Sequence, residues 1–107
     1  MITDDRLQQA ITYMAETDKE AADLKTQVER AAFKLKQVKA AVFVHSSGTV
    51  DERKSFAELD STTVKAEEEY LQVHAESGAV ENKRKTEELI TRIWQSMGAN
   101  RRQGNIT

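Results

Sequence analysis

The stretch His45-Ser46-Ser47-Gly48-Thr49-Val50-Asp51-Glu52-Arg53-Lys54 is the one clear interruption between two long helical runs in this chain. Its Ser-Ser-Gly segment consists of residues that favour turns. Thr49, followed three positions later by Glu52, has the spacing of a capping box, in which both side chains bind free backbone N–H groups at a helix start. The stretch therefore predicts a turn over residues 45–49 that folds the chain into a long antiparallel helical hairpin.

The composition is typical of long helices. The 107 residues include no proline, only 4 glycines and 32% charged side chains, and the apolar residues keep a helical spacing that a disordered chain would lack. The absence of cysteine excludes disulfides and thiolate metal sites. No apolar run approaches the roughly 20 residues that span a bilayer, and the acidic start lacks the apolar core of a secretion signal. We therefore expect one all-α domain over residues 1–107, located in the cytoplasm.

The first helix, expected over about residues 4–44, carries an uninterrupted heptad pattern. The pattern consists of Leu7, Met14, Ala21, Val28, Leu35 and Val42, each seven positions after the last, and of Ala10, Thr17, Leu24, Ala31 and Val38 three positions after the first five. Alternating steps of three and four indicate a coiled-coil seam. Its small and medium side chains predict close approach of a partner helix.

The second helix, expected over about residues 50–100, carries two apolar stripes. One consists of Phe56, Leu59, Thr63, Ala66, Tyr70, Val73, Ser77 and Val80, and the other of Val50, Ala57, Val64, Leu71 and Gly78. Two positions separate the stripes, about 200° around a helix, and the sequence leaves open which of them faces the first helix. A single pair of helices cannot cover both. We therefore expect a homo-oligomeric bundle, most simply a dimer, with Phe56, Leu59, Ala66, Tyr70, Val73 and Val80 at the interface between copies.

The heptad pattern changes phase near residues 81–85. It resumes as Thr86, Ile90, Ile93 and Met97, with Trp94 alongside. Such a shift predicts a local change in supercoil winding. We expect the resumed stripe to meet Ile2, Leu7 and Ile11 of the first helix, and residues 101–107 to form a mobile tail.

Basic residues near the C-terminus form a candidate nucleic-acid surface. They are Lys83, Arg84, Lys85, Arg92, Arg101 and Arg102. Their cations suit phosphates, and Trp94 offers a face on which a base can stack. Alternatively, Trp94 fills the bundle core and the C-terminal arginines complement the helix dipole.

The turn and the acidic residues suggest two further kinds of contact. At the turn the candidate contact residues are His45, Ser46, Ser47, Arg53 and Lys54, where free amides and cations suit an anion. The alternative is a turn whose cap is already filled by Glu52. Acidic residues Asp60 and Glu67–Glu69 can imitate phosphates. We find no catalytic motif, and no pattern that predicts a catalytic residue, a cofactor or a resident metal ion; His74, with Tyr70 and Glu67 on one face, is better explained as a solvated or interface histidine.

Two segments resemble a known group of proteins. Val42-Phe43-Val44-His45-Ser46-Ser47-Gly48-Thr49-Val50-Asp51-Glu52-Arg53-Lys54 and Ile93-Trp94-Gln95-Ser96-Met97-Gly98-Ala99-Asn100-Arg101-Arg102 are similar to small helical proteins that tailed bacteriophages encode near DNA recombination and replication genes. The resemblance covers most of the chain and brings no catalytic residue with it. It implies a non-enzymatic accessory protein of phage DNA metabolism in the host bacterial cytoplasm, which acts on protein partners and on DNA. An inhibitor of a host nuclease or anti-phage defence complex and a purely structural scaffold are the alternatives.

Overall fold

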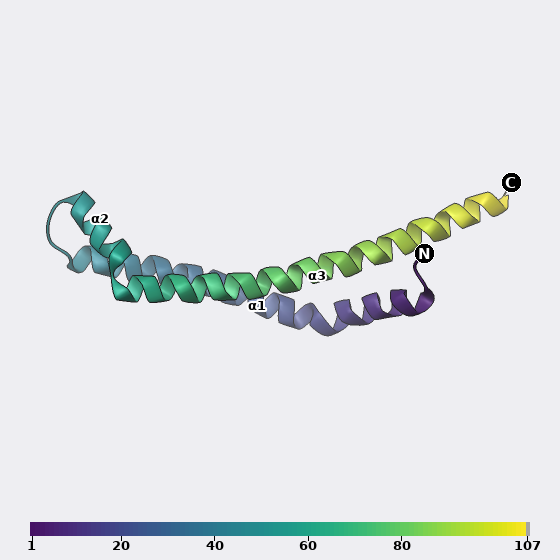
Figure 1. Ribbon diagram of the computed structural model, residues 1–107, viewed down its shortest axis with the longest axis horizontal. Coiled ribbons are helices and arrows are strands. Elements are labelled where there is room, and N and C mark those ends of the chain that lie inside the picture. Colours follow the sequence, from purple (N-terminus) through teal and green to yellow (C-terminus); the bar gives the residue numbers. More distant parts are fainter. Residues whose placement is uncertain (107) are drawn as a thin grey trace. The chain divides into compact units, whose positions relative to one another are not determined.

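Three helices make up the computed structural model, which describes the backbone of residues 1–106 and the side chains of residues 1–101. They are α1 (Asp4–His45), α2 (Val50–Leu59) and α3 (Ser61–Ile106) (Figure 1). The predicted all-α class is confirmed. The second half differs from the prediction in two respects, because Asp60 divides it into two helices and because α3 continues past residue 100. Thr107, the last residue of the predicted tail, lies outside the described residues.

The chain forms two compact units. The terminal unit comprises Met1–Ala21 and Ala79–Thr107, and the turn unit comprises Ala22–Gly78. Both α1 and α3 contribute to each unit, whereas α2 belongs to the turn unit alone. We describe each unit by itself.

Side chains hold the predicted turn in place. Gly48 has a φ of 118°, a conformation that side chains with a Cβ rarely adopt. Thr49 caps α2 by accepting a hydrogen bond from the Glu52 N–H at 3.2 Å, as the capping box predicts. Arg53 donates to the Phe43 carbonyl at 3.1 and 2.9 Å, and its guanidinium lies 4.2 Å from the Phe43 ring centre. These contacts tie the start of α2 to the last turn of α1.

Asp60 ends α2 and begins α3. Its backbone is extended, with φ −62° and ψ 138°, while its N–H still donates to the Phe56 carbonyl. Its carboxylate accepts hydrogen bonds from the hydroxyl and the backbone N–H of Thr62. These two bonds lower the pKa of Asp60. One residue therefore closes one helix and caps the next, so the chain changes direction without a loop.

The seam predicted on α1 is confirmed at every position. All eleven residues from Leu7 to Val42 in the two heptad sets are buried or half-buried, and Ala10 has no exposed surface. The positions between them are exposed, apart from a few long side chains beside the seam. The 3–4 spacing thus marks the face of α1 that packs against α3.

The matching face of α3 is the first of the two predicted stripes. Its covered positions are Thr63, Ala66, Tyr70, Val73, Ser77, Val80, Arg84, Glu87, Thr91, Trp94 and Gly98. Steps of three and four continue through the whole series, so the structure shows no change of phase near residues 81–85. The apparent shift arises because the seam becomes polar at Arg84 and Glu87, where an apolar residue was expected.

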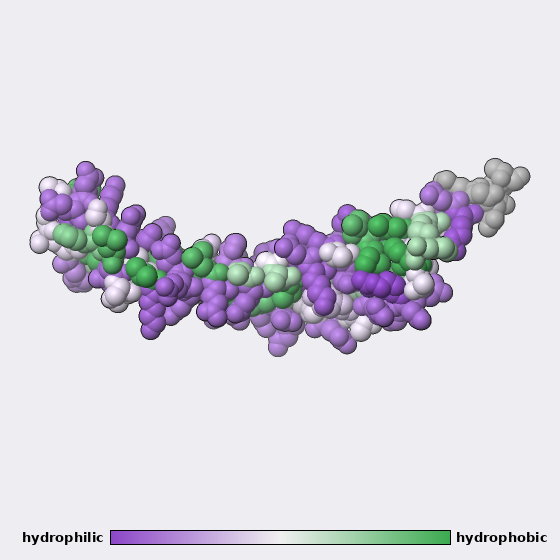
Figure 2. All heavy atoms as spheres, in the orientation of Figure 1, coloured by the Kyte–Doolittle hydropathy of each residue, from purple (hydrophilic) through white to green (hydrophobic). Residues whose placement is uncertain are grey.

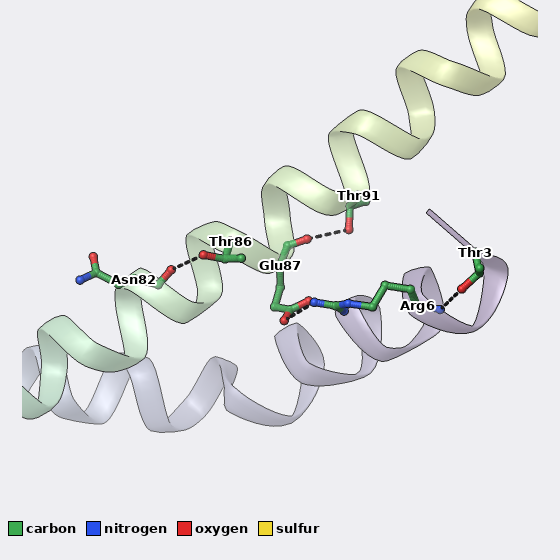
Figure 3. Close-up of polar contacts among 6 residues, drawn as sticks. All are labelled: Thr3, Arg6, Asn82, Thr86, Glu87 and Thr91. Atoms are coloured by element: carbon green, nitrogen blue, oxygen red, sulfur yellow. Dashed lines mark hydrogen bonds and ion pairs between the residues drawn. The ribbon is translucent and has the colours of Figure 1, made fainter. Parts of the chain in front are cut away.

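Contacts of α1 with α2 and α3 show that α1 runs antiparallel to the part of the chain that follows the turn in each unit. In the turn unit, Lys34 Nζ lies 3.0 Å from Glu69 Oε2, and Phe43 is bound by Arg53 near the turn. In the terminal unit, Arg6 pairs with Glu87 (Figure 3), while Arg84 is bound farther along α1. Residue numbers on one helix rise as those of their partners on the other fall, which is the expected antiparallel order.

Candidate protein-binding surfaces

A polar cluster lies inside the seam of the terminal unit. Both terminal guanidinium nitrogens of Arg6 donate to the Glu87 carboxylate, at 2.7 and 2.8 Å (Figure 3). Arg84 donates to the Met14 carbonyl at 2.9 Å, to Thr17 Oγ1 at 2.7 Å and to Asp18 at 3.3 Å. A bidentate guanidinium–carboxylate pair constrains the relative orientation of the two side chains more tightly than a single hydrogen bond does. Polar residues at seam positions specify register, so this cluster selects one alignment of α1 against α3.

The carboxylates in these pairs set the response to acid. The hydrogen bond from Arg6 lowers the pKa of Glu87, and the hydrogen bond from Lys34 lowers the pKa of Glu69, both from an ordinary value of 4.5. A carboxyl whose pKa falls on folding adds stability above its unfolded pKa and loses it as pH drops through the folded value. We expect the melting temperature to be flat from pH 7 to about pH 5 and to fall below about pH 4.5.

The contribution of Glu87 is measured by comparing Glu87→Gln with Glu81→Gln, which changes an exposed glutamate of the same helix. Thermal melts followed by circular dichroism across this pH range are expected to show a lower melting temperature and a weaker acid response for Glu87→Gln alone. Equal acid responses in the two variants would contradict the assignment.

Two exposed apolar side chains of α2 form what we call the turn surface. It consists of Phe56 and Leu59. Phe56 and Leu59 lie three positions apart on one face of α2 and are 50% and 80% exposed, while Ala57 is buried. Single exposed apolar residues are ordinary, but a group of large ones marks a contact surface. Arg53 attaches α2 to α1, and Asp60 joins α2 directly to α3. The position of this surface is therefore fixed by both neighbouring helices.

A second apolar surface runs along α3 in the terminal unit. We call it the flank surface, and it consists of Leu89, Ile90, Ile93 and Met97. Leu89 and Ile93 are 54% and 43% exposed, and the other two are half-buried. Ile90, Ile93 and Met97 each precede a seam residue by one position, so their row is rotated about 100° from the seam. Figure 2 shows apolar side chains gathered over this part of α3.

The flank surface explains the predicted stripe near the C-terminus. The row Thr86, Ile90, Ile93 and Met97 exists, but it lies beside the seam and does not continue it. Of the residues expected to meet it, Ile2 and Leu7 are half-buried, whereas Ile11 is exposed. Trp94, placed alongside by the sequence, is itself a seam residue.

The residues predicted to form an interface between copies fall into two groups in the structure. Four of its residues, Ala66, Tyr70, Val73 and Val80, lie on the face of α3 that α1 covers. Their apolar surface packs inside the chain, and their assignment to an interface between copies stays a prediction. The other two, Phe56 and Leu59, are exposed and belong to the turn surface. The sequence pattern does not distinguish a partner helix within the chain from one in a second copy.

The six candidate nucleic-acid residues do not form one free basic surface. Arg84 is bound to α1, Lys83 lies 4.5 Å from the Tyr13 ring centre, and Arg92 pairs with Glu88 at 2.7 Å. Lys85 and Arg101 are exposed, and the side chain of Arg102 lies outside the described residues. Half of the predicted cations are thus held by groups of this chain.

Some of the candidate contact residues at the turn are bound within the chain, and the others are exposed. Arg53 binds the Phe43 carbonyl, and the Ser46 hydroxyl donates to the Val42 carbonyl at 2.5 Å. His45, Ser47 and Lys54 are exposed. The cap therefore engages Thr49, the contact with Phe43 engages Arg53, and three polar side chains of the segment remain exposed.

The acidic and histidine residues are similarly spread out. Asp60 caps α3 and Glu69 pairs with Lys34, whereas Glu67 and Glu68 are exposed. His74 is exposed, with its ring 5.6 Å from that of Tyr70. Within the described residues, no group of three histidine or acidic side chains is placed to hold a metal ion. These acidic residues and His74 therefore do not form one common binding site.

Comparisons with known proteins assign neither a family nor a function to this chain. No protein-family model, curated protein or solved structure matches the chain. In the described part of the chain, no helix is both long enough and apolar enough to cross a membrane. The functional inference therefore depends on the surfaces themselves.

Proposed function

We propose that the chain is a non-enzymatic, self-associating accessory protein that acts by binding another protein through the turn surface. The observation that carries the proposal is the exposure of Phe56 and Leu59 on a helix that buries Ala57 and is bound to α1 through Arg53. Large apolar side chains on a rigid support suit a protein partner, because binding then orders few additional groups.

The phage assignment belongs to this proposal and comes from the resemblance of the two quoted segments. It places the partner among proteins of phage DNA recombination or replication. Protein contact is favoured over direct DNA contact because Lys83, Arg84 and Arg92 are engaged within the chain. Acidic imitation of DNA is disfavoured for the same kind of reason, since Asp60 and Glu69 also have partners.

Capture from a lysate of phage-infected bacteria tests the proposal. The tagged chain is compared with Leu59→Asp and with Leu71→Asp, a matched change at an exposed leucine of α3 in the same unit. We expect Leu59→Asp to lose at least about nine-tenths of the captured partner, since a central apolar anchor commonly contributes 2 kcal/mol or more, and Leu71→Asp to keep it. Equal capture by both variants would contradict the turn surface.

The identity of the captured protein decides between the functional classes. A recombination or replication protein supports the accessory role, whereas a host nuclease or defence protein supports the inhibitor alternative. Purified components then test whether the contact is direct. Partner capture that depends on Arg101 and is abolished by nuclease treatment would instead indicate a DNA bridge.

A further inference from the structure

We propose that a pocket beside the turn surface binds a basic side chain, arginine or lysine, of the partner protein. This inference rests on the proposed function and names the chemistry of the partner's contact residue. The pocket has a volume of about 410 Å³ and lies between the end of α1 and the start of α3. Its lining residues are Ala41, Val42, His45, Ser46, Asp60 and Thr62.

The two hydroxyl groups of the pocket already donate their protons within the chain. The Ser46 hydroxyl donates to the Val42 carbonyl at 2.5 Å, and the Thr62 hydroxyl donates to the Asp60 carboxylate. A hydroxyl has one proton and two lone pairs, so each of these oxygens offers only lone pairs to a ligand. The hydroxyl groups therefore favour a ligand that donates hydrogen bonds.

The Asp60 carboxylate adds a negative charge to the pocket. A carboxylate has about four lone-pair positions, and two groups of Thr62 and the N–H of Thr63 occupy three of them. All three donors are neutral, and Asp60 forms no ion pair among the side chains that the structure describes. A basic side chain in the pocket would neutralise this carboxylate and donate to the hydroxyl oxygens as well.

The surroundings of the pocket favour a basic partner over an acidic one. Residues 55–80 include six acidic side chains and one basic side chain. Such a field speeds the arrival of a cationic partner and disfavours an anionic one. Lys39 and Lys54 line a different cavity of the same unit. The ring of His45 adds a flat face against which a guanidinium can stack.

The pocket adjoins the turn surface through Asp60. This residue follows Leu59 in the chain, and its N–H donates to the Phe56 carbonyl at 3.0 Å. One partner segment can therefore place an apolar side chain against Phe56 and Leu59 and a basic side chain in the pocket. The charged contact then contributes orientation and specificity to the apolar one.

NMR titration of the ¹⁵N-labelled chain with N-acetyl-arginine amide tests the pocket without the partner. We expect the largest shifts at the amides of residues 45–46 and 60–62, with a dissociation constant of roughly 10 mM for this single side chain. N-acetyl-glutamine amide at the same ionic strength is expected to leave these amides unchanged. Absence of shifts at the pocket with the arginine probe, or equal shifts with both probes, would overturn the proposal.

The variant Asp60→Asn removes the charge and keeps a residue that caps helices as well as aspartate does. It is expected to weaken binding of the arginine probe at least about fivefold, because charge-assisted hydrogen bonds are lost, with unchanged helix content. The matched control is Asp51→Asn, at an exposed aspartate in the first turn of α2, which is expected to keep the wild-type affinity. Equal affinity of the two variants would overturn the role of Asp60.

A second pair of variants blocks the pocket without changing its charge. Ala41 is exposed and lines the pocket, so Ala41→Leu is expected to fill part of it and to abolish binding of the arginine probe. Ala40→Leu changes a neighbouring exposed alanine outside this pocket and is expected to leave binding unchanged. Wild-type binding by Ala41→Leu would place the probe elsewhere and overturn the pocket.

Capture of the phage partner separates this inference from the proposed function. If Leu59→Asp loses the partner and Asp60→Asn keeps it, the turn surface stands and the pocket is overturned. The reverse result contradicts the turn surface and supports the pocket, whereas loss in both, with capture by Asp51→Asn, supports both. If Asp60→Asn instead changes the sedimentation of the purified chain, the pocket holds a basic residue of a second copy, and its assignment to the partner is overturned.

Discussion

Ala66→Asp is expected to unfold the chain, whereas Ala75→Asp on the same helix is expected to leave it folded. Ala66 is 4% exposed in the seam, and Ala75 is exposed. A buried carboxylate without a partner costs several kcal/mol, and a small domain is stable by only about 5–15 kcal/mol in total. Circular dichroism at 222 nm with thermal melting measures the difference.

The Ala75→Asp variant controls for the lower helix propensity of aspartate, which is common to both changes. Its melting temperature is expected to fall by a few degrees at most. If the two variants melt at similar temperatures, α1 does not cover Ala66 and the assigned face of α3 is wrong.

Replacing Arg6 and Glu87, the two partners of one ion pair, together by leucine is expected to raise the melting temperature and to remove the unique alignment of the helices. Buried ion pairs are often replaced by apolar residues at no cost or with a gain of about 1–4 kcal/mol. The same polar groups specify register, because any other alignment leaves them unpaired. We expect Arg6→Leu/Glu87→Leu to form mixed oligomers in sedimentation and to lose dispersion in NMR spectra.

The matched control is Glu88→Leu/Arg92→Leu, which removes both partners of an exposed ion pair on α3. It is expected to melt within a few degrees of the wild type. A lower melting temperature for Arg6→Leu/Glu87→Leu would mean that the ion pair stabilises the seam and does not merely select its register.

The sequence predicted the parts of the fold that depend on local rules. Thr49 and Glu52 marked the start of α2 because capping follows a fixed spacing, and Gly48 marked the turn because it adopts a positive φ. The seam of α1 was predicted completely, since its apolar and small residues recur without interruption from Leu7 to Val42.

Two features required the structure. Phe56 and Leu59 fit the same 3–4 spacing as Thr63, so periodicity alone joined α2 and α3 into one helix. The residues after the break, Asp60-Ser61-Thr62, are typical of helix starts and were the available signal. Near the C-terminus, the sequence analysis assigned the flank surface to the seam because its residues are apolar. The seam itself passes through the polar residues Arg84 and Glu87.

The candidate contact residues could be listed from the sequence, but their availability could not. Arg53 and Arg84 are basic residues whose partners are carbonyl groups brought close by folding. Phe56 and Ala66 occupied the same predicted stripe, yet one is exposed and the other is buried. Exposure depends on which helix covers which face, and that is decided by the break at Asp60 and by the alignment of α1 with α3.

The pairing of α1 with α3 inside one chain is the central claim, and isotope-mixed cross-linking tests it most directly. Unlabelled and ¹⁵N-labelled chains are mixed, unfolded and refolded together, and zero-length carbodiimide coupling joins contacting amines and carboxylates. The Lys34 amine lies 3.0 Å from the Glu69 carboxylate. Mass spectrometry is expected to find this cross-link with both peptides labelled or both unlabelled. Mixed labelling at Lys34–Glu69 would show that the helices pair between copies and would contradict the account.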